Sequence, residues 1–359
     1  MSKLAKLLLF FVQSAKMLSM ETKLLKANEE SILLACELLK KGEVVAVPTE
    51  TVYGLAGDAR NSSAIKKIFA AKGRPADNPL IVHIASREML AGVVRYVSDD
   101  AKKLMDAFWP GPLTIIMPKG DAICDETCAG LDSVGVRMPS NPVAHKIIEK
   151  SGVPFSAPSA NLSGKPSPTN AEDVFADMNG RIPLVVDGGE SDAGVESTVI
   201  SVLAETPVIL RPGVVTKEMI EDVLKKPVEI AKAVTEGVKK DEKVLSPGMK
   251  YKHYAPNADV VILKGTFESF KKYVDEHKQD DTFALCFDGE EKELSVPAVT
   301  YGHITSPKEQ AHELFTALRE LDKKQAKLVF ARCPEMSGGS LAVYNRLIRS
   351  AGFKIIELN

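Results

Sequence analysis

The stretch Val44-Val45-Ala46-Val47-Pro48-Thr49-Glu50-Thr51-Val52-Tyr53-Gly54-Leu55 joins an apolar run to a polar turn. The four apolar residues 44–47 predict a strand that is covered on both faces, as strands of α/β sheets are. The segment before it predicts a helix, which Asn28 caps and Gly42 ends. This succession indicates an α/β fold, and it places the turn at the carboxyl end of a strand, where open α/β sheets bind ligands.

The same alternation of helices and strands continues along the chain. Up to residue 226, further strands are expected at residues 80–84, 113–117, 135–138, 155–157, 184–186, 198–202 and 208–210, and helices at 62–73, 98–108, 142–150, 171–178 and 217–225. After residue 258, strands are expected at 260–263, 283–287, 328–331 and 354–358, and helices at 267–276, 308–322 and 341–350. The sequence therefore predicts two α/β domains, residues 21–226 and 258–359, joined by a linker, residues 227–257. The second is a small, parallel, Rossmann-like domain, and because it has no GxGxxG or Walker loop we assign it no cofactor.

The bulk composition is that of a globular protein. The chain has 359 residues, of which 45% are hydrophobic and 26% charged, with a formal net charge of -2. These values give no global indication of nucleic-acid binding, although a local basic groove stays open. The five cysteines form no CxxC pair, which leaves a zinc ribbon unsupported and favours reduced thiols in the cytoplasm.

Residues 1–20 are expected to be an N-terminal extension that precedes the native start. The apolar run within residues 4–12 is too short to span a membrane. A weak signal-like segment with a poor cleavage site is one interpretation of these residues. Met20 as the native start is the interpretation that we favour, because orderly secondary structure follows it.

Two basic residues, Lys72 and Arg74, leave the end of a predicted helix on either side of Gly73. They can converge on one anion, with the arginine forming a fork and the lysine a point charge. The ordinary alternative is a solvated basic helix terminus, favourable against the helix dipole. His83, in the next strand, is by itself more often a structural histidine than a ligand.

Small polar residues follow the strand expected at 155–157. Ser159 and Asn161, with Gly164 close behind, suit a nest of donors around phosphate or ribose oxygens, although turn formers are common in any loop. Arg137 and Arg211 lie at two further strand ends, and each alone could be a surface ion pair. Together, cations and hydroxyl-rich loops at the strand ends of one domain predict a site for anionic substrates.

Several segments occur in an order that identifies a family. They are PTETVYGL (48–55), KGRPADNPLIVHI (72–84), GVRMP (135–139), SAPSANLSG (156–164), ESTVI (196–200) and LRPG (210–213). They closely resemble the YrdC-like family, whose KxR and SxN signature is met by Lys72, Arg74, Ser159 and Asn161. The segment SPGMKYKHYAP (246–256) and the C-terminal domain resemble the two-domain branch, the threonylcarbamoyl-AMP synthases. Residues 337–347 only approximate that branch, which leaves the role of the last domain open.

The resemblance implies a YrdC-like twisted mixed sheet with flanking helices. It also implies that L-threonine, bicarbonate and ATP are converted to threonylcarbamoyl-AMP and pyrophosphate. A downstream tRNA threonylcarbamoyl transferase would then move the acyl group onto the adenosine beside the anticodon of certain tRNAs, for which this chain needs no tRNA contact of its own. Mg²⁺ would bridge the phosphates through substrate oxygens, without a metal site in the protein.

The same resemblance assigns roles to individual residues. Catalysis falls to Lys72, Arg74 and Ser159; threonine binding to Thr51, His83, Arg137, Ser159 and Ser197; and ATP binding to Lys72, Arg74, Asn78, Asn161, Thr169, Arg211, Lys250, His253 and Tyr254. We expect the linker to fold over the nucleotide as a lid that excludes water, the alternative being a plain tether. No covalent nucleophile is needed, since in-line positioning of two bound reactants can lower a barrier by roughly 7–11 kcal/mol.

Two rival functions share features of this sequence. The carbamoyltransferase of hydrogenase maturation contains a YrdC-like module, but it also needs an acylphosphatase domain and paired zinc-finger cysteines, which this sequence lacks. A non-catalytic RNA-binding module would need a basic excess and aromatic stacking platforms, whereas aromatic residues are only 6% of the chain. The sequence therefore favours the synthase.

Overall fold

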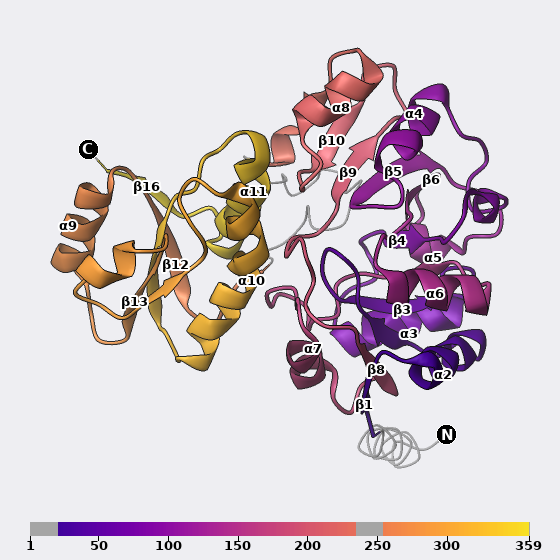
Figure 1. Cartoon of the computed structure of the whole chain (residues 1–359), viewed down its shortest axis with the longest axis horizontal. Coiled ribbons are helices and arrows are strands. Elements are labelled where there is room, and N and C mark those ends of the chain that lie inside the picture. The colour runs from indigo at the N-terminus through magenta and orange to yellow at the C-terminus, as the bar shows by residue number, and fades with distance from the viewer. Residues whose placement is uncertain (1–20, 235–253, 359) are drawn as a thin grey trace, which may run out of the picture.

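A computed structural model describes residues 21–234 and 254–358, and the chain forms two lobes (Figure 1). The elements of the N-terminal lobe are β1 (Lys23–Lys26), α2 (Glu29–Lys40), β2 (Val45–Val47), β3 (Gly54–Asp58), α3 (Ser62–Lys72), β4 (Ile81–His83), α4 (Asp99–Phe108), β5 (Leu113–Pro118), α5 (Asp125–Cys128), β6 (Ser133–Arg137), α6 (Pro142–Ser151), β7 (Phe155–Ser156), α7 (Ala171–Met178), β8 (Leu184–Asp187), β9 (Thr198–Ser201), β10 (Val208–Arg211), α8 (Lys217–Leu224) and β11 (Glu229–Ile230).

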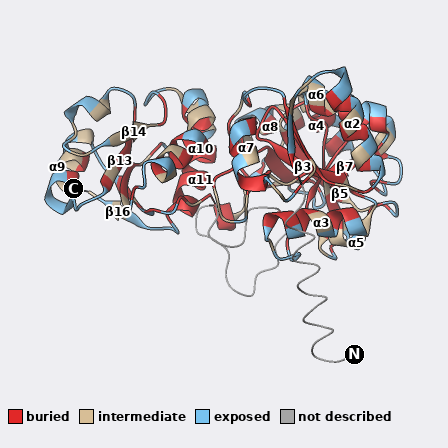
Figure 2. Cartoon of the chain, turned by 90° about the horizontal axis from the view of Figure 1, so that it is seen from below, coloured by how far each residue is buried: buried red, intermediate tan, exposed pale blue. Residues whose placement is uncertain are grey.

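The strands of this lobe form one twisted mixed sheet. Among the described residues the order is β1-β8-β2-β3-β7-β4-β6-β5-β9-β10-β11. Helices cover both faces, with α2, α4, α6 and α8 on one side and α3 and α5 on the other (Figure 2). Apolar side chains of α2 and α6 pack on one face, and those of α3 pack on the other. The predicted twisted mixed sheet with flanking helices is confirmed.

Local sequence signals explain where the helices of the site begin and end. Asn28 caps α2 by accepting a hydrogen bond from the backbone N of Ser31 at 2.9 Å. Gly73 follows α3 with a left-handed φ of 62°, which a glycine adopts without the strain of a Cβ. Lys72 therefore sits in the last turn of α3, and Arg74 leaves it in a new direction.

The segment after the first quoted strand departs from expectation. The expected polar turn spans residues 48–53, but the chain then forms β3, which was not expected and which runs antiparallel to β2. This strand contains two glycines, and because glycine is uncommon in strands, β-propensity does not predict it. Gly54 is needed because a Cβ there would lie 2.9 Å from Cβ of Ala157. The close approach of the two segments places residues 157–159 beside the turn.

The C-terminal lobe is a parallel α/β unit, as predicted. Its elements are β12 (Asp259–Lys264), α9 (Phe267–His277), β13 (Thr282–Cys286), β14 (Ala298–Thr300), α10 (Pro307–Lys323), β15 (Leu328–Arg332), α11 (Leu341–Ser350) and β16 (Ile355–Glu357). The described strands lie in the order β14-β13-β15-β12-β16, all parallel to their neighbours. Helices α10 and α11 face the N-terminal lobe (Figure 1).

An apolar core joins the two lobes. Val52 and Val195 of the N-terminal lobe are buried in the same cluster as Leu314 and Leu318 of α10 and Leu341 of α11. Strand β11 lies inside the range expected as linker and pairs with β10, so the first sheet extends past residue 226. Among the described residues, the structure contains no helix both long enough and apolar enough to cross a bilayer.

Candidate functional site

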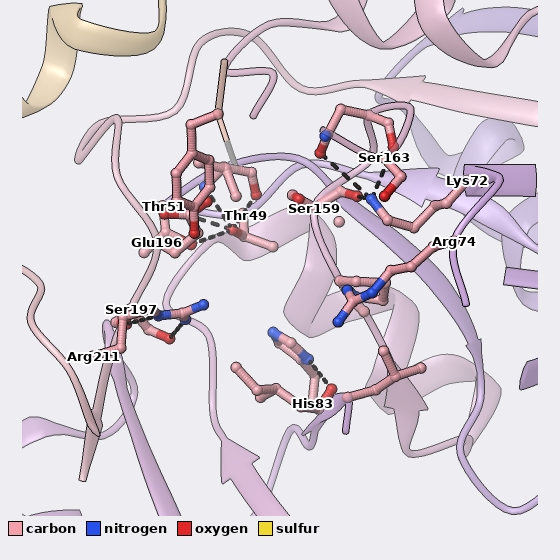
Figure 3. Close-up of a pocket in the computed structure, with 18 of the residues that line it drawn as sticks. Thr49, Thr51, Lys72, Arg74, His83, Ser159, Ser163, Glu196, Ser197 and Arg211 are labelled. Carbon is pink, nitrogen blue, oxygen red and sulfur yellow. Dashed lines mark hydrogen bonds between the residues drawn. The ribbon is translucent and has the colours of Figure 1, made fainter. Parts of the chain in front are cut away.

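Loops that are distant in sequence meet in one hollow of the N-terminal lobe, which we call the central pocket (Figure 3). Its volume is about 760 Å³, part of it open to solvent. The expected site residues that line it are Thr51, Lys72, Arg74, His83, Arg137, Ser159, Asn161, Ser197, Arg211 and Tyr254. Asn78 and Thr169 are buried nearby without lining it, and Lys250 and His253 lie outside the described residues.

Lys72 joins the two halves of the KxR and SxN signature. Its Nζ donates to the carbonyl oxygen of Asn161 at 2.8 Å and to that of Ser159. Burial, and then the neighbouring Arg74, hold the pKa of Lys72 well below its usual range. An incoming anion would reverse that shift, so Lys72 is suited to receive negative charge from a substrate.

Two arginines approach the central pocket from opposite walls (Figure 3). Arg74 packs 6.0 Å from the ring centroid of Phe69. Arg211 donates from Nε to the carbonyl oxygen of Ser197 at 3.0 Å and from Nη2 to Ser197 Oγ at 3.1 Å. Burial lowers the pKa of Arg211 to about 10, which leaves it cationic at neutral pH.

Arg137 is held by a carboxylate that the sequence analysis did not single out. Its Nη2 lies 2.6 Å from Oε1 of Glu50, and both side chains are buried. Its Nη1 donates to Oγ1 of Thr51 at 2.8 Å, and that hydroxyl also contacts Oγ1 of Thr49 at 2.9 Å. Burial alone would raise the pKa of Glu50, but Arg137 holds it below its ordinary value. Arg137 therefore fixes Thr51 in place.

His83 presents a neutral ring to the central pocket. Its Nδ1 lies 3.2 Å from the carbonyl oxygen of Ile81, so Nδ1 carries the hydrogen and Nε2 is left as an acceptor. The ring stacks on Phe155 at 5.6 Å between centroids. Burial, and then the charge of Arg137, lower the pKa of His83 to about 3. The imidazole can therefore accept a hydrogen bond from a bound group without changing its charge.

Glu196 is a pocket residue that the sequence analysis quoted but gave no role. Ser167 Oγ donates to its Oε1 at 2.6 Å, and Arg346 of the C-terminal lobe lies 3.0 Å from its Oε2. A carboxylate is unfavourable in a site for anions unless a cation compensates its charge. The sequence does not reveal that cation, because Arg346 lies 150 residues away from Glu196. Proximity to Ser197 in ESTVI was the signal that could have pointed to it.

Two expected ATP residues connect the lobes. Tyr254 lines the central pocket and packs on Phe315 of α10 at 5.2 Å between ring centroids. Thr169 contacts Oγ1 of Thr316 on the same helix at 3.3 Å. The C-terminal lobe therefore lies directly behind the pocket wall.

The chemistry of the lining is that of an anion-binding site. Five basic side chains, of which Arg137 and Lys165 are paired with carboxylates, line the same space as several hydroxyls and one neutral imidazole. No group of three or more histidines, cysteines or carboxylates that could hold a metal ion is found among the described residues. Together, the twisted mixed sheet and this pocket define a YrdC-like α/β protein.

Comparison with known proteins agrees. Residues 37–213 match the Sua5_yciO_yrdC family, described as "Telomere recombination", and residues 215–352 match "Threonylcarbamoyl-AMP synthase, C-terminal domain". A threonylcarbamoyl-AMP synthase of Bacillus subtilis is 45% identical over 338 residues, 93% of this chain and 96% of the relative. One of Pyrococcus abyssi is 41% identical over 342 residues, 93% of this chain and 97% of the relative. The chain belongs to the threonylcarbamoyl-AMP synthase family.

The solved structures of the Pyrococcus abyssi protein, Sua5, share this fold. Its complex with L-threonine gives a TM-score of 0.85 at 40% identity, covering 94% of this chain and 99% of that one. A variant with a neighbouring histidine and tyrosine replaced by alanine gives 0.86 at 39% identity, covering 94% and 98%. The likeness therefore extends over both lobes.

Proposed function

We propose that this chain is an L-threonylcarbamoyladenylate synthase, which makes threonylcarbamoyl-AMP and pyrophosphate from L-threonine, bicarbonate and ATP. The observation that carries the proposal is the convergence of Lys72, Arg74 and Arg211 on one pocket, where the lining carboxylate Glu196 is already paired with Arg346. A triphosphate and a carboxylate both need dense positive charge before they can approach each other. The names of the relatives support the same activity.

The reaction is a nucleotidyl transfer that needs positioning more than acid–base chemistry. The threonine amine adds to carbon dioxide derived from bicarbonate and loses a proton, giving a carbamate. A carbamate oxygen attacks the α-phosphorus of ATP, and the bond to the bridging oxygen of pyrophosphate breaks. Lys72 and Arg74 would compensate the charge on the α-phosphate as the adenylyl group is transferred, and Ser159 would lie where the two substrates meet.

We assign the two substrates to adjoining parts of the central pocket. Thr51, Ser197 and His83 would hold threonine, with Arg137 acting through Thr51. Arg74, Asn161 and Arg211 would hold ATP, with Tyr254 at the mouth; the proposal also keeps Asn78, Thr169, Lys250 and His253 as ATP residues of the loop and linker. Discrimination against serine would rest on one methyl group, worth only about 1–3 kcal/mol.

Mg²⁺ enters this scheme as part of the substrate. Among the described residues, the carboxylate that lines the pocket is Glu196, and it is paired with Arg346. Mg²⁺ would arrive bound to the phosphates of ATP, as it often does in nucleotide enzymes.

The product is a mixed anhydride, and such compounds are labile in water. It must be consumed by a transferase, for which we propose the tRNA threonylcarbamoyl transferase that modifies adenosine beside the anticodon. We place both steps in the cytoplasm, where the five free thiols of this chain would stay reduced. The linker with His253 and Tyr254 would act as the lid that keeps water away from the product.

The assay mixes the purified chain with MgATP, L-threonine and bicarbonate. We expect pyrophosphate release that depends on threonine and an acyl-AMP visible by mass spectrometry. Replacing L-threonine with valine, which lacks the hydroxyl, should reduce the rate more than replacing it with serine. RNA binding without any threonine-dependent pyrophosphate would favour the RNA-binding module instead.

A further inference from the structure

Helix α11 of the C-terminal lobe reaches the wall of the central pocket through one buried side chain. Arg346 has none of its surface exposed, and its Nε lies 3.0 Å from Oε2 of Glu196. Glu196 lines the pocket, and its other carboxylate oxygen accepts a hydrogen bond from Ser167. The C-terminal lobe thus supplies the cation that pairs with a pocket carboxylate.

The same guanidinium holds the backbone behind two further pocket residues. Its Nη2 donates to the carbonyl oxygen of Glu196 at 3.3 Å, and its Nη1 donates to that of Pro212 at 2.5 Å. Ser197 and Arg211 are the chain neighbours of these two residues and are hydrogen bonded to each other. Arg346 therefore fixes two segments from behind while their front sides face the pocket.

The ion pair also decides the charge that the pocket presents. Burial alone would raise the pKa of Glu196, but Arg346, and after it Arg211, hold that pKa below its ordinary value, so the carboxylate is ionised at neutral pH. Removing one partner of a buried ion pair leaves an uncompensated charge, which is strongly unfavourable. Without Arg346, the Glu196 carboxylate would attract Arg211 away from the substrate and would repel an anionic substrate.

We propose that Arg346 is a positioning residue for anion binding in the central pocket, so that the C-terminal lobe completes the site instead of only stabilising it. Arg346 neutralises Glu196 and holds Ser197 and Arg211 in place. This rests on the proposed function, because the anion concerned is the triphosphate of ATP. Since Arg346 lies behind the pocket wall, its loss should raise KM for ATP more than it lowers kcat.

The test compares KM for ATP and kcat of four full-length variants with the parent chain. Arg346→Met should raise KM for ATP at least tenfold, and Arg346→Lys, which keeps the charge, should stay within about threefold of the parent. Arg346→Met combined with Glu196→Gln should have a lower KM for ATP than Arg346→Met, because no carboxylate is then left unpaired. Its KM should stay above that of the parent, because the contacts of Arg346 with the carbonyl oxygens of Glu196 and Pro212 are still lost. Arg349→Met is the matched control: it removes a buried arginine one turn along α11 that donates to the carbonyl oxygen of Ala233 and not to Glu196.

Each outcome separates a positioning role from a structural one. If Arg346 only stabilises the fold, the double variant will bind ATP no better than Arg346→Met, and Arg349→Met will show the same rise in KM as these two variants. That result overturns the proposal. If Arg346→Met does not fold, as judged by circular dichroism, the other two Arg346 variants test the proposal. A tenfold rise of KM in Arg346→Lys, or a KM of the double variant equal to that of the parent, is then contrary evidence. An inactive parent chain would overturn the proposed function and this inference with it, whereas an active parent with unchanged KM in Arg346→Met overturns the inference alone.

Discussion

Charged side chains in the central pocket are buried with partners that the protein itself provides. Lys72 contacts carbonyl oxygens, Arg211 contacts Ser197, and Arg137 is paired with Glu50. A buried charge is costly unless it is paired and hydrogen bonded. These contacts hold each cation in one orientation before a substrate arrives, so the positions of the charges are set in advance.

Lys72→Met should show that the charge of Lys72 serves activity and not the stability of the fold. We expect kcat/KM to fall by about 10²–10³-fold, because a fixed cation beside the transferring group is lost. The free energy of unfolding should change by less than about 2 kcal/mol, since the apolar side chain is not penalised by burial as the ammonium is. Lys66→Met on the same helix is the control, because Lys66 is exposed and pairs with Glu126. Equal losses in the two variants would contradict the assigned role.

His83 predicts a pH dependence of stability. Its pKa is about 3 in the folded chain and its ordinary value is 6.5, so the unfolded chain binds the extra proton as the pH falls below 6.5. Stability therefore falls as the pH drops from 6.5 towards 3, by up to roughly 1.4 kcal/mol per pH unit from this group. In urea unfolding at about pH 7.5, 5.5 and 4.5, the advantage of the parent over His83→Gln should shrink with falling pH. A constant difference would contradict this prediction, because it would show that His83 binds its proton equally well in the folded and unfolded chains.

Helix ends could be predicted from sequence because their signals are local. Asn28 and Gly73 act within a few residues of themselves, and both mark the observed ends of α2 and α3. Strand β3 could not be predicted, since Gly54 is explained only by the close approach of Ala157 from elsewhere in the chain. The same holds inside the site. Lys72, Arg74, Asn161 and Arg211 were expected to converge and do line one pocket, whereas the partner of Glu196 lies on another lobe.

Strand β3 offers a matched pair of glycines to test this close approach. A Cβ at Gly54 would lie 2.9 Å from Cβ of Ala157, which cannot rotate away, while a Cβ at Gly57 would meet the flexible end of Ile68 at 3.1 Å. Gly54→Ala should therefore cost about 1–3 kcal/mol of stability, and Gly57→Ala less than about 1 kcal/mol. Gly54 also bridges to Ser159, so kcat/KM should fall at least tenfold in Gly54→Ala alone. Denaturant unfolding measures the stability of the two variants, and the pyrophosphate assay measures their kcat/KM. Equal losses in Gly54→Ala and Gly57→Ala would show that the strand can shift to accommodate the added Cβ.

The two lobes act as one unit because the helices of the second lobe contact the loops that build the pocket. Arg319 of α10 donates to the carbonyl oxygen of Pro166 and lies 2.9 Å from Oδ2 of Asp177, and His312 lies 3.1 Å from the carbonyl oxygen of Asp192. Together with the apolar core around Val195, these contacts hold the backs of loops whose fronts line the pocket. The position of the C-terminal lobe is therefore expected to control the shape of the site.

Gly194 lets α10 approach this closely, and its replacement tests the docking of the whole molecule. A Cβ at Gly194 would lie 2.3 Å from Cα of His312 and 2.4 Å from the carbonyl oxygen of Ala311, so Gly194→Ala must push the helix away. We expect a larger radius of gyration in X-ray scattering and a kcat/KM at least tenfold lower. Gly152→Ala is the control, because Gly152 has a similar φ of 65° against 72° but no atom within 4 Å of an added Cβ. Both variants carry the backbone strain of a left-handed alanine, about 1 kcal/mol. The two variants differ only in whether the C-terminal lobe is displaced. If scattering shows that displacement in Gly194→Ala and kcat/KM is unchanged, the pocket keeps its shape without the C-terminal lobe, and the prediction is wrong.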